Sequence, residues 1–193
     1  MGSVRKEQKL KTKERLLRSA FEAFSCGGIL TTKTLDIAKA ANISHGAVFA
    51  HFPTKEALLT AVIDEFGLQL GAQLQNEMQD LSIEAVLKTH IRVLEQWEPF
   101  YRQLIISAPH LPETIRVMIS NIHSGIAYYL KQAVEQEGIR LAVPLHILVN
   151  TWLGLLHYYL ENRALFVADG SLLAAKGQEL CYFYLKIIKG LSL

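Results

Sequence analysis

The segment ISHGAVFAHFPTKEALL, residues 43–59, most constrains what this 193-residue chain can fold into. It places a glycine and two histidines in about two helical turns. Pro53 must then end that helix before a new one starts at TKEALL, because proline cannot donate the amide hydrogen bond of an interior helical residue. A surface helix over a core would be charged on its outer side, and catalytic histidines would be paired with a carboxylate or a thiol. We therefore interpret the first part as a short helix that a partner approaches closely.

The residues before this segment predict two further helices. Residues 5–25 repeat apolar side chains every three to four positions, which indicates an amphipathic helix that ends at Gly27-Gly28. The stretch TTKTLDIAKAAN predicts a short helix that begins at a threonine cap, and Thr32 and Thr34 are equally suitable caps. The apolar positions expected to face inward are, in the first helix, Leu10, Leu16, Leu17, Ala20, Phe21 and Phe24, and in the second, Leu35, Ile37, Ala38 and Ala41.

The two short helices are expected to form a helix-turn-helix. Asn42 stands where a left-handed residue would end the first of them, and asparagine tolerates that conformation. Ser44 is placed to cap a second helix over residues 45–51. Two short helices joined by such a brief turn are the arrangement used by many DNA-binding proteins.

The rest of the chain predicts only helices. A long helix capped by Thr54 is expected over 55–79, with Gly67 and Gly71 as weak points, and others near 82–98, 100–108, 112–137, 144–166 and 171–190. No stretch alternates apolar and polar residues as a half-buried strand would. The expected fold is all-α, with about nine helices. A helix-turn-helix domain over residues 1–60 is followed, through the long helix, by a helical domain over 80–193.

Charge is distributed unevenly along the chain. Residues 1–56 contain ten Lys or Arg against five Asp or Glu, a net +5, whereas the remaining residues contain ten against thirteen, a net −3. A basic end on a weakly acidic body is typical of a protein whose end meets an anionic partner, although a solvated basic tail has the same composition. The two isolated cysteines and the lack of an apolar leader predict a reduced, cytoplasmic location.

Residues 141–160 contain no charged side chain over about the length of a membrane span. Proline, asparagine, threonine, glycine and two histidines interrupt their apolar character, and no basic cluster flanks them. We expect a helix buried by protein and no membrane partner.

The residues expected on the outer surface of the helix over 45–51 are suited to contacts with DNA bases. Val48 and Phe52 are expected to face the preceding helices, which leaves His45, Ala47, Ala50 and His51 outward, with Gly46 keeping that surface low. A thin, uncharged helix fits the major groove of duplex DNA. Ser44 and His45 are suited to hydrogen bonds with base edges and Ala47 to a thymine methyl group. Lys55, at a helix N-terminus, is suited to a phosphate.

These residues resemble the DNA-binding signature of the TetR family of bacterial transcriptional regulators. The matching positions of TTKTLDIAKAANISHGAVFAHFPTKEALL are Thr32, Ile37, Ala38, Ala41, Ser44, Gly46, Val48, His51, Phe52, Lys55 and Leu58. The resemblance is strong over residues 5–60 and extends beyond them only through the number and lengths of the helices.

The resemblance implies a homodimer that binds a palindromic operator as a repressor, and a small effector that releases DNA by shifting the long helix. It also implies the residues that contact DNA. Ser44, His45, Gly46 and Ala47 would approach bases, whereas Phe49, His51 and Lys55 would meet the backbone and Thr32 a phosphate; Thr34 and Ala50 complete the predicted DNA-binding set. Phe49 replaces the usual tyrosine and lacks its hydroxyl, and Ala50 is smaller than in many relatives, so base reading is expected to depend on His45 and the N-terminal arm.

The C-terminal domain carries the effector and dimer predictions. Six residues are candidates for an apolar cavity with a few polar groups, which suits a small lipophilic or aromatic effector: Trp97, Tyr101, His123, Tyr128, Trp152 and His157. The same aromatic side chains are equally suited to a plain core. The resemblance assigns the last two helices to the dimer interface, and the candidates there are Leu153, Leu156, Leu173, Leu180, Tyr184 and Ile187. This apolar stripe also fits packing on the chain's own core, and the two-fold symmetry of operators favours the partner.

Two other classes of function are less well supported. One alternative is an all-α small-molecule or lipid-binding protein whose basic end docks on a membrane, but that would need Lys or Arg beside exposed aromatic residues. An enzyme is not expected, because no acid–base constellation, nucleophile motif or phosphate loop is present. His45 and His51 are six residues apart, which does not place them on one helical face, so no metal site and no cofactor are expected.

Overall fold

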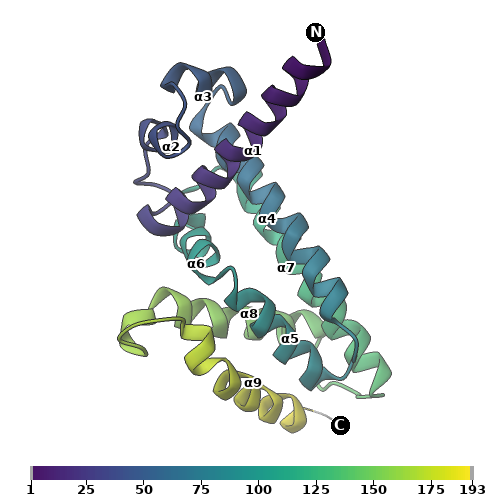
Figure 1. The fold of residues 1–193 in the computed structure, drawn as a ribbon. Coiled ribbons are helices and arrows are strands. Elements are labelled where there is room, and N and C mark those ends of the chain that lie inside the picture. Colours follow the sequence, from purple (N-terminus) through teal and green to yellow (C-terminus); the bar gives the residue numbers. More distant parts are fainter. Residues whose placement is uncertain (1, 192–193) are drawn as a thin grey trace. The chain divides into compact units, whose positions relative to one another are not determined.

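The computed structural model describes the backbone of residues 2–191 and the side chains of residues 6–191. The side chain of Arg5, counted above among the basic residues, and the last two residues of the predicted C-terminal domain lie outside these limits. The described residues form nine α-helices and two short 3-10 helices, with no β-strand (Figure 1). The predicted all-α class is confirmed. No helix in the described part is both long and apolar enough to cross a bilayer.

The helices are α1 (Gly2–Gly27), α2 (Thr34–Ala40), α3 (His45–His51), α4 (Lys55–Glu77), α5 (Ile83–Glu95), α6 (Glu98–Ser107), α7 (Glu113–Gln136), α8 (Leu145–Glu161) and α9 (Leu172–Gly190). The 3-10 helices are η1 (Ala108–His110) and η2 (Arg163–Leu165). The predicted bounds of α3 are confirmed. Pro99, expected to separate two helices, instead lies in the first turn of α6, where proline costs no hydrogen bond. Gly67 and Gly71 do not interrupt α4.

The chain forms two compact units, and each combines segments that are distant in sequence. The first contains the residues up to Phe66 together with Pro99–Ile115. The second contains Gly67–Glu98 together with the chain from Arg116 onward. Helices α4, α6 and α7 each contribute residues to both units.

Aromatic packing explains why residues 99–115 belong to the first unit. The ring of Phe100, at the start of α6, lies 4.6 Å from that of Phe21 on α1 and 5.1 Å from that of Phe66 on α4. Phe100 is fully buried, and burying a side chain of this size contributes about 1.5–3 kcal/mol. Sequence periodicity identifies such a residue as apolar but does not say which helices it joins.

The predicted inward faces of α1 and α2 are confirmed only in part. Leu16, Ala20 and Phe24 are buried on α1, and Ile37 and Ala38 are buried on α2. Leu10 and Leu35 were expected to be inside, but they are exposed, Leu35 to 44%. Leu10 lies in the first part of α1, where residues 6–11 are all exposed, and Leu35 lies on the face of α2 opposite to the buried Ile37.

The threonine cap predicted for α2 is wrong for both candidates. Lys33 is the N-cap, and no side chain bonds the free amides of that turn. The hydroxyl of Thr32 lies within hydrogen-bonding distance of the carbonyls of Gly28 (2.6 Å) and Ala23 (3.1 Å), so it closes the end of α1. Thr34 is the first residue of α2, and its hydroxyl bonds a residue of α3 that is described below.

In the second unit, α9 lies along α5 and also contacts α8 (Figure 1). The helices α5 and α9 approach closely because Gly177 has no side chain: a Cβ atom there would overlap the Cγ2 atom of Ile91. The N-terminus of α9 is held by Glu98, a buried carboxylate. It accepts hydrogen bonds from the Ser171 hydroxyl (2.6 Å) and from the amides of Leu172 (2.8 Å) and Leu173 (2.9 Å). Glu98 thereby provides hydrogen-bond acceptors for amides of the first helical turn that have no partner within the helix.

We predict that Gly177→Ala destabilises the protein by about 1–3 kcal/mol, because the added methyl group overpacks the α5–α9 contact. Urea denaturation at fixed protein concentration measures the change. Gly71→Ala is the matched control: a Cβ atom at Gly71 meets nothing within 4 Å, so helix propensity should stabilise that variant slightly. Ile91→Ala should suppress the effect of Gly177→Ala. Equal stability of the Gly177→Ala and Gly71→Ala variants would contradict the close approach.

Candidate nucleic-acid interface

The helix-turn-helix is built by a tight turn between α2 and α3. Asn42 has φ = 50°, the left-handed conformation that its sequence position predicts. The turn closes through hydrogen bonds from the Asn42 amide to the Lys39 carbonyl and from the Ile43 amide to the Ala38 carbonyl, each 3.0 Å. Ser44 caps α3 as expected, its hydroxyl accepting a bond from the Ala47 amide at 3.2 Å.

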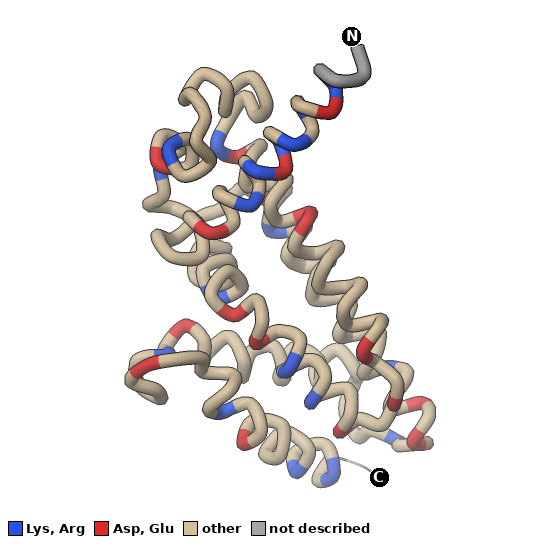
Figure 2. The backbone as a smooth tube through the Cα atoms, viewed as in Figure 1, with Lys and Arg blue, Asp and Glu red and all other residues tan. Residues whose placement is uncertain are grey.

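The two faces of α3 divide as the sequence predicts. Val48 and, just past the helix end, Phe52 are buried, whereas His45 and Ala50 are exposed. Ala47 and His51 are half-buried. Figure 2 shows α3 without a charged residue, while Lys and Arg recur along the neighbouring α1. This gives α3 an outer surface of small and neutral side chains beside a basic helix.

Gly46 is not required by packing inside the chain. A Cβ atom added to it would meet nothing within 4 Å. A glycine also weakens a helix relative to alanine by about 1 kcal/mol, so its presence at the second position of α3 has no local benefit. Packing within the described residues therefore does not account for this glycine.

Lys55 begins α4 as expected, but its ammonium group is already engaged. Its Nζ donates a hydrogen bond of 3.0 Å to the Leu30 carbonyl, and partial burial lowers its pKa. Thr54 caps α4 through a bond from the Ala57 amide at 3.0 Å. A phosphate contact by Lys55 would therefore replace or share the bond to Leu30.

His45 is the most constrained side chain on the exposed face. Its Nε2 lies 3.0 Å from the hydroxyl of Thr34, the first residue of α2. Its ring also meets the ring of Phe49 edge-on, with centroids 5.0 Å apart. Phe49 is 43% exposed. All three residues were predicted from the sequence to contact DNA, but their contacts with one another were not predicted.

A family profile described as bacterial regulatory proteins of the tetR family matches residues 16–62, which include all of α2 and α3. This N-terminal segment is therefore similar to that of TetR-family proteins. A transcriptional repressor of Mycobacterium tuberculosis is 39% identical over 79 residues, which are 41% of this chain and 42% of that protein. A probable acrEF/envCD operon repressor of Escherichia coli is 28% identical over 121 residues, 60% of this chain and 48% of that protein. The chain thus spans less than half the length of these curated relatives.

Solved structures extend the TetR likeness to the whole fold. GusR of Salmonella enterica is 21% identical with a TM-score of 0.71, and the match covers 94% of this chain and 95% of that one. The TetR-family regulator PfmR of Thermus thermophilus is 22% identical with a TM-score of 0.66, covering 91% and 97%. At these identities the likeness concerns the fold alone. It agrees with the expected plan of an N-terminal helix-turn-helix followed by a helical C-terminal part.

The six predicted effector residues are distributed over the two units. Tyr101 is buried in the first unit, and the other five are in the second. Trp152 is fully buried, Trp97 is half-buried and donates to the Gln73 side chain at 3.1 Å, and Tyr128 is 59% exposed. His123 and His157 do lie together, with ring centroids 5.1 Å apart.

His123 borders a groove of about 310 Å³ between α7 and α8. The groove is uncharged. Its polar lining consists of Ser120, His123, Ser124, His146 and Asn150, and its apolar lining of Ala127, Leu145, Val149 and Leu153. Sequence periodicity missed most of these polar residues, because a polar residue at the edge of a helix face looks the same whether it borders solvent or a groove.

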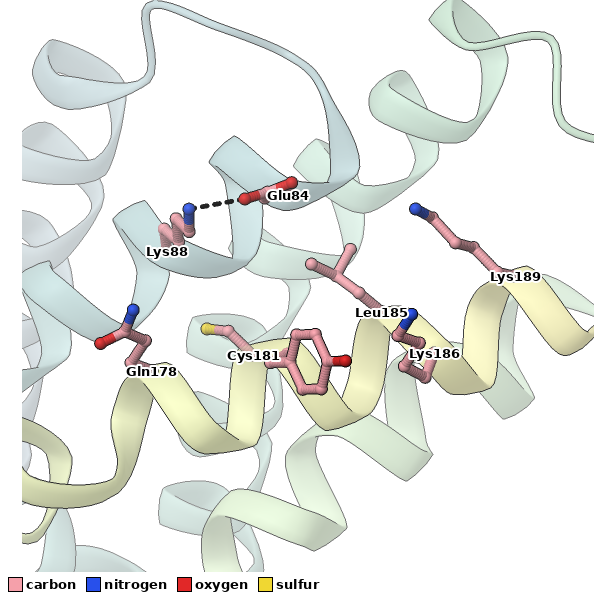
Figure 3. A pocket seen from close by; sticks show the side chains of 8 residues that line it. Glu84, Lys88, Gln178, Cys181, Leu185, Lys186 and Lys189 are labelled. Atoms are coloured by element: carbon pink, nitrogen blue, oxygen red, sulfur yellow. Dashed lines mark hydrogen bonds and ion pairs between the residues drawn. The ribbon is translucent and has the colours of Figure 1, made fainter.

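A second groove, of about 300 Å³, follows the contact between α5 and α9 (Figure 3). Lys88, Lys186 and Lys189 border it, and Lys88 pairs with Glu84 at 2.6 Å. The sulfur of Cys181 also lines it, but burial raises the pKa of this thiol to about 12. The thiol therefore stays protonated at neutral pH and is not an activated nucleophile.

Most of the predicted dimer residues are buried within the single chain. Leu153, Leu156, Leu173, Leu180 and Tyr184 are buried inside the second unit, and Ile187 is half-buried. Buried side chains have no surface left for a partner. The apolar side chains that α8 and α9 expose are instead Ile147, Tyr158, Tyr182 and Phe183. Helical periodicity identified an apolar stripe on α9 that fits either the core or a partner, and within the single chain Leu173, Leu180 and Tyr184 of this stripe are buried in the core.

Three histidines in the second unit are kept neutral. Burial, aided by the nearby His123 and His157, lowers the pKa of His90 to about 3. Burial also lowers the pKa of His123 and of His157 to about 4. The Nδ1 atom of His90 accepts a hydrogen bond of 3.1 Å from the Trp152 indole. Protonation of Nδ1 would set two N–H groups against each other and break this bond.

We predict that stability falls as the pH drops from about 6.5 toward 4. Over this range the unfolded chain binds protons at these histidines and the folded chain does not, which costs about 1.4 kcal/mol per unit of pKa difference for each group. His90→Gln keeps an acceptor for Trp152 but cannot be protonated, so it should flatten the dependence. His110→Gln, at an exposed histidine, is the control. Thermal unfolding between pH 4 and 7.5 measures the slope, and equal slopes for the wild type and His90→Gln would contradict the role of His90.

Proposed function

We propose that this chain is a transcriptional regulator that binds duplex DNA through α2 and α3 and acts as a repressor. The observation that carries the proposal is the outer face of α3, which combines small uncharged side chains with a glycine that internal packing does not require. The match of residues 16–62 to the TetR family and the names of the curated relatives support it. In this function α3 enters the major groove, and His45 with Ser44 contacts base edges.

The basic α1 is suited to the DNA backbone. Among the described residues it carries Lys6, Lys9, Lys11, Lys13, Arg15 and Arg18 against three glutamates. Two of these lysines have partners: Lys11 pairs with Glu7 at 2.7 Å, and Lys13 lies over the Phe52 ring at 5.8 Å. Contacts of this kind add affinity without sequence preference and weaken with salt.

Binding to a selected duplex should be saturable, with a dissociation constant of about 10⁻⁸ M or below at moderate salt. The duplex is selected from a randomised pool with the full chain, and binding is followed by fluorescence anisotropy in a salt titration. We expect log affinity to fall linearly with log salt. His45→Ala should weaken the selected duplex about 10-fold, while His110→Ala, at an exposed histidine outside α2 and α3, should not. Equal, weak binding of all duplexes by both the wild type and His45→Ala would refute the proposal.

We also propose that the regulator is a homodimer. A two-fold dimer places two recognition helices about 34 Å apart, which matches one turn of a palindromic operator. The exposed residues of α8 that are suited to the interface follow one face, at Ile147, Thr151, Gly154 and Tyr158. On α9 the corresponding residues are Tyr182 and Phe183, with the half-buried Ile187 beside them. Small residues at the centre of this face would allow close approach.

A charge on this face should prevent dimer formation without unfolding the chain. We predict that the double variant Tyr158→Glu with Phe183→Glu sediments as a monomer and keeps its helical circular dichroism, because the changed side chains are exposed. Val117→Glu, at an exposed valine of α7, should remain dimeric. Loss of the dimer in both variants, or in neither, would place the interface elsewhere.

The groove between α7 and α8 is the proposed effector site. Its neutral lining suits a small uncharged molecule with one or two hydrogen-bonding groups, in line with the lipophilic or aromatic effector expected from the sequence. FadR of Bacillus subtilis, which has a similar fold, was solved in complex with stearoyl-CoA. An effector that releases DNA must bind the state that does not bind DNA more tightly than the state that does. Helix α4, which contributes to both units, is the proposed link.

A further inference from the structure

The hydrogen bond between Thr34 and His45 joins the two helices of the helix-turn-helix. Thr34 is the first residue of α2 and His45 the first residue of α3, and their side chains meet at 3.0 Å. The ring contact with Phe49, one turn further along α3, supports the imidazole from a second direction. The side chain expected to contact bases is therefore held in place before DNA arrives.

The bond decides which ring atom remains for DNA. A neutral imidazole has one nitrogen that donates and one that accepts. Since Nε2 is used by Thr34, only Nδ1 is left for a base. The Thr34 hydroxyl has a single proton, and within the described residues its Oγ1 makes no hydrogen bond other than the one to His45. If the hydroxyl donates this proton to Nε2, the ring proton lies on Nδ1, and the single donor of the hydroxyl is used while the Nδ1–H donor remains for DNA.

We propose that Thr34 is a positioning residue that fixes His45 as the Nδ1–H tautomer, so that α3 presents one hydrogen-bond donor to the major groove. This inference rests on the proposed DNA-binding function. The donor selects bases with an acceptor on their major-groove edge: guanine through N7 or O6, adenine through N7 and thymine through O4. Cytosine presents only an N–H donor there and is disfavoured at that position. Thr34 thereby influences the operator sequence without contacting DNA.

The phenylalanine at position 49 fits this arrangement. A tyrosine in its place would carry a hydroxyl suited to a phosphate, but the phenylalanine ring has no polar group and lies against His45. Edge-to-face ring pairs of this kind stabilise a side-chain position beyond the effect of the area that they bury. In this chain the Phe49 ring therefore supports His45, the residue proposed to contact bases.

The first test uses the free protein. Nitrogen-15 NMR at about pH 8.5, where an ordinary histidine is neutral, distinguishes the two tautomers, and His45→Gln assigns the signal by its loss. We expect Nδ1–H to dominate in the wild type and in Thr34→Ser, which keeps the hydroxyl. Thr34→Val keeps the shape and lacks the hydroxyl, so its spectrum should shift toward a mixture. A wild-type ring protonated on Nε2, or a spectrum that Thr34→Val does not change, would overturn the proposal.

The second test is a double-mutant cycle on the selected duplex and its single-base variants. Thr34→Val should weaken binding about 3- to 10-fold, the usual worth of one hydrogen bond, and reduce the preference at one base pair. Thr34→Ser should bind like the wild type. In the His45→Ala background, Thr34→Val should cause no further loss.

The two tests separate the possible failures. An equal loss from Thr34→Val in both backgrounds would mean that Thr34 contacts DNA itself, which overturns the positioning role. The predicted tautomer in a protein that binds no duplex specifically would refute the proposed function, and with it the operator preference, while the Thr34–His45 arrangement itself would stand.

Discussion

The outer face of α3, which is proposed to contact DNA, keeps its position because the inner face of this seven-residue helix is buried. A helix as short as α3 is not stable alone in water, so its position is set by what holds it. Val48 and Phe52 fix its inner side, Ser44 closes its first turn, and the left-handed Asn42 sets the angle at which it leaves α2. With these three constraints satisfied, the outer face needs no large or charged residue for stability. The residue types on the outer face can therefore be those that suit a binding partner.

In the second unit, too, the positions of the helices are fixed by contacts with other elements. There the close α5–α9 contact at Gly177 and the buried Glu98 at the start of α9 hold the helices by contact and by hydrogen bonds. The interior contains polar groups that stay neutral, since burial keeps the histidines unprotonated at physiological pH. These neutral histidines and the uncharged groove between α7 and α8 suit a small-molecule site better than a site for nucleic acid. The side chains of the N-terminal part thus suit the proposed DNA binding, and those of the C-terminal part suit the proposed effector binding.

Local patterns predicted the helix-turn-helix well because its determinants are local. The bounds of α3, the Ser44 cap, the Asn42 turn and the inward Val48 each depend on residues within a few positions of one another. The cap of α2 was wrong because Thr32 and Thr34 both have better partners elsewhere, in the carbonyls at the end of α1 and in His45. An apolar stripe on α9 was recognised, but periodicity does not say whether the chain's own core or a second copy covers it. The polar lining of the α7–α8 groove was missed for a similar reason, since it is assembled from two helices.

By itself, the sequence determined the all-α class, the helix-turn-helix and the residue types on its outer face, because helix propensity, capping and turn chemistry act over a few residues. Only the tertiary structure decided that Thr34 bonds His45, that residues 99–115 join the first unit through Phe100, and that the leucines of α8 and α9 are core. Each of these depends on contacts between residues far apart in the sequence. Such contacts follow from how helices pack, and a one-dimensional pattern does not contain that information.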